Sequence, residues 1–156
     1  EVEGAIVGAG TILNTVNLNE ALAAGSEFII TPGLTDSLLA AGVECGVPFM
    51  PGIATVSDLM RCLEAGIDVM KFFPAEANGG AKALKAFAGP FSGIAFCPTG
   101  GIGLDNMASY LTLPSVLSVG GSWICPNDLI AAGEWQAITD LAAEAVAKVA
   151  SIKEGA

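Results

Sequence analysis

One lysine interrupts an apolar run near the middle of the chain. Residues 69–73, Val-Met-Lys-Phe-Phe, otherwise have the composition of a buried β-strand. Burial of an ammonium group costs free energy unless the group is paired or loses its proton. A neutral amine in a dry pocket attacks a ketone to form a Schiff base, so Lys71 is a candidate nucleophile. The alternative is a lysine at a strand end whose amine reaches solvent.

Few side chains could act as an acid or a base beside Lys71. The chain contains no histidine, which excludes the commonest general base and every histidine-based triad. Glu76 follows the lysine strand and is the chief carboxylate candidate, although a carboxylate there is more often a helix N-terminal residue favoured by the dipole. Thr11, Thr55 and Thr99 are candidate hydroxyl donors to a substrate carboxylate, and each could equally be a helix cap or a turn residue.

Two glycine pairs form candidate anion-binding loops. Residues 98–102 and 120–122 follow the last two apolar runs of the chain. Paired glycines let backbone N–H groups approach an anion closely, and a helix that starts behind them adds a favourable dipole. In (β/α)8 barrels the loops after strands seven and eight commonly bind phosphate. The alternative is that these glycines only form tight turns.

The apolar runs belong to a repeat of strand, loop and helix. Six short runs rich in Val, Ile, Phe and Met alternate with helical segments about twenty residues apart, as βα units do. The runs lack strict polar alternation, which is typical of parallel strands covered on both faces. Asn17 is the expected N-cap of the first helix, and Thr55 with Asp58 predicts a capping arrangement at the third. The expected helices cover residues 18–24, 37–45, 56–65, 82–88, 106–111 and 135–152.

Two architectures fit this repeat, an open doubly wound sheet and a (β/α)8 barrel. Gly, Pro or Thr follows each strand at its C-terminal end, as if several loops converge on one site, which favours the barrel. A barrel needs eight units, and about six are present, with the first two missing. We therefore expect residues 1–156 to form a single α/β domain, an N-terminally incomplete (β/α)8 TIM barrel.

Composition excludes several classes of partner. A net charge of -10 argues against nucleic acid, which selects clusters of Lys and Arg. The longest uncharged stretch, residues 106–127, is interrupted by Pro and Gly, so we expect no membrane span, and the sequence has no signal-peptide pattern. The four cysteines are scattered, without a CxxC pair or a histidine for a zinc site, so we expect no metal and a cytoplasmic protein.

The loop motifs, taken in order, resemble those of one enzyme family. Together they are similar to 2-keto-3-deoxy-6-phosphogluconate (KDPG) aldolase, a family that also cleaves 4-hydroxy-2-oxoglutarate (KHG). The resemblance extends along essentially the whole chain, so it is more specific than any single motif. The motifs that carry it are residues 7–11, 32–35, 51–55, 71–76, 97–101 and 120–123.

The resemblance implies a fold, partners and residue roles. Members of this family are class I aldolases with a (β/α)8 barrel, usually homotrimeric, that need no metal or other cofactor. The implied small-molecule partners are a phosphorylated keto sugar acid and pyruvate. By resemblance, Lys71 is the Schiff-base lysine, and the pyruvyl pocket contains Thr11, Pro32 and the aromatic Phe73. Thr99 matches a position that influences the stereochemistry of aldol addition. Gly100, Gly101 and Ser122 match the positions that contact the phosphate.

The chain departs from the family pattern at its start. The family begins with a helix and two βα units, which carry a glutamate that acts as general acid/base and an arginine that binds substrate, and neither has a counterpart in residues 1–156. The expected activity is cleavage of KDPG to pyruvate and glyceraldehyde 3-phosphate, and of KHG to pyruvate and glyoxylate. The alternatives are a truncated, non-catalytic barrel fragment that acts as a scaffold or binding module, and a Schiff-base lyase for another 2-keto acid.

Overall fold

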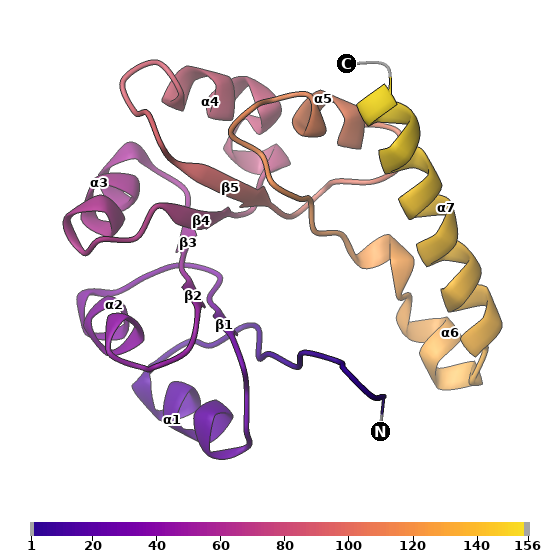
Figure 1. The fold of residues 1–156 in the computed structure, drawn as a ribbon, viewed down its shortest axis with the longest axis horizontal. Coiled ribbons are helices and arrows are strands. Elements are labelled where there is room, and N and C mark those ends of the chain that lie inside the picture. The colour runs from indigo at the N-terminus through magenta and orange to yellow at the C-terminus, as the bar shows by residue number, and fades with distance from the viewer. Residues whose placement is uncertain (1, 155–156) are drawn as a thin grey trace.

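Helices and short parallel strands alternate along the chain in the computed structural model, which describes residues 2–154 (Figure 1). This arrangement confirms the expected α/β class. The strands are β1 (Ile29–Ile30), β2 (Phe49–Met50), β3 (Gly52–Ile53), β4 (Val69–Phe72) and β5 (Ala95–Pro98). The helices are α1 (Thr15–Ala23), α2 (Asp36–Val43), α3 (Val56–Glu64), α4 (Gly80–Phe87), α5 (Met107–Leu111), α6 (Asn127–Ala132) and α7 (Trp135–Glu154), with 3-10 turns η1 (Glu76–Asn78) and η2 (Ser122–Ile124).

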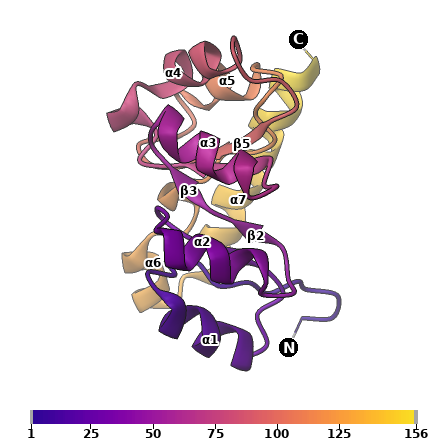
Figure 2. The ribbon, with the colours of Figure 1, turned by 90° about the vertical axis from the view of Figure 1, so that its left-hand side faces the viewer.

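The strands form one curved, parallel layer. β1 pairs with β2, and β3, β4 and β5 pair in that order, all in parallel register. Only Pro51 separates β2 from β3, so the two sheets share a continuous segment of chain. Single bridges add a segment at each side, Ala9 to Ile29 and Val116 to Phe96. In Figures 1 and 2 the strands line the inner side of an arc, and α1 to α5 cover its outer side.

The pleat of β4 separates the core from the inner face of the arc. Met70 and Phe72 are fully buried, whereas the intervening Lys71 is only partly buried, because successive side chains of a strand point to opposite faces. The ring of Phe87 from α4 packs edge-on against Phe72, with centroids 5.9 Å apart. A smaller cluster, formed by Leu18, Ile29 and Leu38 among others, holds α1 and α2 against β1.

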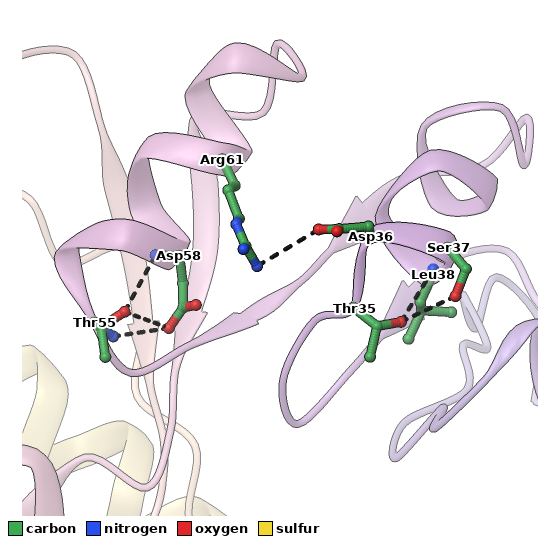
Figure 3. Close-up of polar contacts among 7 residues, drawn as sticks. All are labelled: Thr35, Asp36, Ser37, Leu38, Thr55, Asp58 and Arg61. Atoms are coloured by element: carbon green, nitrogen blue, oxygen red, sulfur yellow. Dashed lines mark hydrogen bonds and ion pairs between the residues drawn. The ribbon is translucent and has the colours of Figure 1, made fainter.

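The capping arrangement predicted for the third helix is confirmed (Figure 3). Asp58 N donates to Thr55 Oγ1 over 3.2 Å, and Thr55 N donates to Asp58 Oδ2 over 3.0 Å. The N-cap predicted for the first helix is wrong. That helix begins at Thr15 and is capped by Asn14, whose Oδ1 accepts a hydrogen bond from Asn17 N over 2.9 Å. Asn17 therefore lies within the first turn, where the capped N–H groups are found.

The C-terminal part of the chain contains one helix that was not predicted. α6 begins after Pro126 and ends at Gly133, which has a left-handed conformation with φ of 71°. α7 then runs back along the arc and packs against η2 and α5. None of the helices within residues 2–154 combines the length and apolar character needed to cross a membrane.

The capping box should contribute measurably to stability. We expect Thr55→Ala to lower the free energy of unfolding by about 1 kcal/mol, because the N–H group of Asp58 at the start of α3 loses its acceptor. Urea denaturation followed by circular dichroism measures this loss. The matched control is Thr139→Ala within α7, where the hydroxyl bonds the carbonyl of Trp135 and caps no N–H group. An equal loss in both variants would contradict the assignment.

Candidate functional site

Lys71 lies on the inner face of the arc, near the C-terminal end of β4. Its Nζ stands 4.6 Å from the centroid of the Phe73 ring, which covers the amine on one side. Burial lowers the pKa of Lys71 below the ordinary lysine value, and the neighbouring Cys97 acts in the opposite direction. Desolvation disfavours the charged form, so a larger fraction of the amine is neutral and nucleophilic at a given pH.

The strands beside β4 supply the neighbours of the amine. Gly52 of β3 and Cys97 of β5 are in register with Lys71 on either side. Ser118 Oγ lies 3.2 Å from Cys97 Sγ and extends this row to the last strand segment. Neither Cys97 nor Ser118 was a predicted site residue. The signal that could have identified Cys97 is its position two residues before Thr99, on the same face of a strand.

Thr31 holds the predicted pocket residue Pro32 close to β3. Thr31 is completely buried, accepts a hydrogen bond from Gly52 N over 3.0 Å and donates one to the carbonyl of Gly33 over 2.6 Å. The backbones of Gly52 and Pro32 approach each other so closely that a Cβ on Gly52 would stand 2.3 Å from the carbonyl carbon of Pro32. Pro32 therefore lies within one strand of Lys71, since Gly52 pairs with the lysine.

Thr11 lies at the C-terminal end of the segment next to β1. It has a φ of 57°, the left-handed region that a non-glycine residue rarely adopts. The following residue, Ile12, is buried and donates its N–H to the carbonyl of Ile30 over 3.4 Å. Such strained backbone is concentrated at functional sites, where the surrounding structure holds it in place. The structure thus brings Thr11 to the same edge of the sheet as Pro32.

The two glycine loops lie side by side after β5 and the last strand segment. Thr99 pairs with Gly120, and a Cβ on Gly120 would stand 2.6 Å from Thr99 Oγ1. Gly100 and Gly101 have φ of 104° and 76°, which glycine alone adopts without strain. Within residues 2–154 the N–H groups of Gly100, Gly101 and Gly121 have no hydrogen-bond acceptor. Adjacent free N–H groups of this kind can bind an anion.

Glu76, the carboxylate candidate, forms hydrogen bonds with α5 and with the loop after β5. Its Oε1 accepts a hydrogen bond from the hydroxyl of Tyr110, a fully buried residue of α5. Its backbone N–H donates to the carbonyl of Gly100 over 3.1 Å. Glu76 occupies the first turn of η1, as its alternative interpretation predicted. The contacts with Tyr110 and Gly100 carried no signal in the sequence.

The arrangement brings the partly desolvated amine of Lys71 and the free N–H groups of the glycine loops to one edge of a parallel sheet. Lys71 lies in β4 and Thr99 directly follows β5, the adjacent strand, so both lie where the C-terminal ends of the strands meet, which is where barrel enzymes carry their active sites. A groove of about 650 Å³ lies between α7 and residues 117–124, and Gly120 and Gly121 of the second glycine loop line it, whereas Lys71 does not. Its other walls are mainly apolar and include Leu117, Trp123 and Val149.

Comparison with known proteins gives a consistent result. The family profile "KDPG and KHG aldolase" matches residues 1–141. A 2-dehydro-3-deoxy-phosphogluconate aldolase of Dickeya dadantii (strain 3937) is 58% identical over 147 residues, which cover 94% of this chain and 69% of that protein.

Solved structures show the same similarity. A KDPG aldolase from Legionella pneumophila, with pyruvate captured as a covalent carbinolamine, superposes with a TM-score of 0.86 at 46% identity, over 88% of this chain and 67% of the other. The aldolase of Zymomonas mobilis ZM4, solved with 3-phosphoglycerate, has a TM-score of 0.78 at 49% identity, over 81% of this chain and 61% of the other.

The lowered pKa of Lys71 predicts a characteristic pH dependence of amine reactivity. Reductive methylation requires the neutral amine, so its rate at Lys71 should reach half its maximum at a pH below the ordinary lysine pKa of 10.5. Peptide mass spectrometry after brief labelling at a series of pH values measures this midpoint. The control is the same lysine in the urea-denatured protein, where the midpoint should rise. A native midpoint at or above the denatured one would contradict the assignment.

Proposed function

The chain belongs to the KDPG and KHG aldolase family, and on this premise we propose that it is the class I aldolase that cleaves KDPG to pyruvate and glyceraldehyde 3-phosphate. Membership of this family makes the protein a lyase. The proposal extends to KHG, which the same family name includes, with pyruvate and glyoxylate as products. The observation that carries it is Lys71, a partly desolvated amine on the inner face of a parallel strand.

Lys71 is the nucleophile in this proposal. Its neutral Nζ attacks the ketone carbon of the substrate and forms a carbinolamine, the kind of intermediate captured with pyruvate in the Legionella enzyme. Loss of water leaves an iminium, which accepts the electron pair of the C3–C4 bond as that bond breaks. The aldehyde leaves, and the remaining enamine of pyruvate is protonated and hydrolysed to free the amine. Phe73 excludes water beside Nζ, and Thr11 and Pro32 line the pyruvyl pocket.

The glycine loops bind the phosphate in this proposal. The free N–H groups of Gly100, Gly101 and Gly121 supply donors for its oxygens, together with the exposed Ser122 at the start of η2. Thr99 joins this loop to β5, the strand next to Lys71, and contacts the substrate between its two ends. A phosphorylated ligand, 3-phosphoglycerate, is present in the Zymomonas structure, which supports a phosphate site in the family.

We assign the proton transfers to no carboxylate of residues 2–154. Glu76 is the carboxylate candidate nearest the lysine strand in sequence, but Tyr110 donates to its Oε1 and its side chain packs against the loop of Gly101. A carboxylate held in this way is poorly placed to shuttle protons at C4 of a substrate bound to Lys71. Its role is structural, and the general acid/base belongs to another part of the complete site.

The proposal includes a complete (β/α)8 barrel. Residues 5–9 and 116–120 form the two edges of the curved layer, and within residues 2–154 no strand pairs with their outer sides. Ile6, Val7 and Leu117 expose apolar side chains there. Two further strands would cover these edges, and unpaired edges of this kind promote aggregation. Family resemblance also supports a homotrimer in the cytoplasm.

The Schiff base is tested by trapping. Borohydride with pyruvate should add one pyruvyl group per chain, located on Lys71 by peptide mass spectrometry. Lys71→Ala should abolish the adduct and lower kcat by at least about a thousandfold, the effect of removing a nucleophile. Lys82→Ala, the same change at an exposed lysine of α4, should leave both unchanged. An adduct that survives Lys71→Ala would end the assignment.

The barrel is tested by intact mass. The protein purified from its source should have a mass larger than that of residues 1–156 by the two units that complete the barrel. A stable, monomeric species with the mass of residues 1–156 alone would contradict the proposed barrel.

A further inference from the structure

The loops after β4 and β5 are joined by backbone hydrogen bonds. Ala75 N donates to the carbonyl of Thr99 over 2.8 Å, and Glu76 N donates to the carbonyl of Gly100 over 3.1 Å. The carbonyl of the next residue, Gly101, accepts from Asn106 Nδ2 over 2.9 Å. Three successive carbonyls of the loop are therefore bound by the protein, while the N–H groups of Gly100 and Gly101 have no acceptor within residues 2–154.

The stem of the exposed Glu76 side chain lies against this loop. A Cβ added to Gly101 would stand 2.8 Å from Glu76 Cγ and 2.9 Å from Glu76 Cβ, so the carboxylate stem lies directly against the glycine. On the other side, a Cβ on Gly80 would stand 3.2 Å from both Glu76 Oε1 and the Tyr110 hydroxyl. Glycines at both positions leave room for the pair, and larger residues would displace it.

Tyr110 anchors Glu76 to the core. Tyr110 is fully buried in α5, the helix that follows the loop, and its hydroxyl donates to Glu76 Oε1. Burial, the hydrogen bond and the charge of Glu76 raise the pKa of Tyr110 above its ordinary value, so the phenol remains a donor at neutral pH. The bond fixes the Glu76 side chain, whose stem lies against Gly101, and so fixes the support of the loop.

We infer that the Glu76–Tyr110 pair is a positioning element that holds the loop of Gly100 and Gly101 in its anion-binding conformation, and so sets the preference for phosphorylated over unphosphorylated 2-keto acids. This inference rests on the proposed function, because it concerns the phosphate site of the same reaction. Neither residue touches the reacting carbon atoms. Their loss should therefore weaken phosphate recognition and leave the chemistry at Lys71 intact.

The test compares two substrates in the full-length protein. Tyr110→Phe removes only the hydroxyl and should raise KM for KDPG about 10- to 150-fold, the effect expected for loss of a hydrogen bond to a charged group. KM for unphosphorylated KHG and kcat for both substrates should change less than about twofold. Competitive inhibition by inorganic phosphate should weaken by the same factor as KM for KDPG. Thr112→Ala, which removes an exposed hydroxyl at the end of α5, is the control and should change neither constant.

Glu76 variants keep the test valid if Tyr110→Phe fails to fold. Glu76→Gln retains an acceptor for Tyr110 and should keep most of the selectivity, whereas Glu76→Ala should lose it as Tyr110→Phe does. Combining Glu76→Ala with Tyr110→Phe should raise KM for KDPG no more than either change alone.

Equal KM increases for both substrates, an effect confined to kcat, or unchanged selectivity would overturn the inference. Pyruvate trapping at Lys71 separates a failure of this inference from a failure of the proposed function. Trapping tests the aldolase proposal, and pyruvate carries no phosphate.

Discussion

The alternation of side chains along β4 is the constraint on which the rest of the site depends. Met70 and Phe72 are fully buried on the helix side, so the intervening Lys71 must face the inner side of the arc. A one-residue slip of this strand would bury the lysine among Phe87 and Phe96 and expose Phe72, at a cost of several kcal/mol. The packing of two apolar residues thus fixes the direction of the Lys71 side chain.

The parallel pairing of the strands converts this local constraint into a site. Because the chain runs in the same direction in β3, β4 and β5, the loops that follow them meet at one edge. Backbone and side-chain hydrogen bonds then fix each loop to its neighbour. Thr31 joins the Pro32 loop to β3, and the N–H groups of Ala75 and Glu76 join the loop after β4 to that after β5. Lys71 lies on a strand, and the candidate substrate-binding residues lie in loops that support one another.

The repeat, the α/β class and the position of Lys71 in a strand could be predicted because each depends on local patterns. Hydrophobic runs, helix stops and the Thr55–Asp58 cap are encoded within a few neighbouring residues. The contact of Tyr110 with Glu76 spans 34 positions, and that of Thr31 with Gly52 spans 21, so neither has a sequence signature. Asn14 and Asn17 compete as caps of one helix, and composition alone does not distinguish them.

The environment of Lys71 connects the fold to its chemistry. Desolvation is the main reason for the lowered pKa, although the layer described by residues 2–154 covers only part of the inner face. Strands that paired with the edges at residues 5–9 and 116–120 would remove more water from this face. Closure by apolar side chains alone would lower the pKa of Lys71 further, whereas a carboxylate brought close to the amine would raise it. The chemistry of the groups that cover the inner face therefore decides what fraction of the Lys71 amine is neutral.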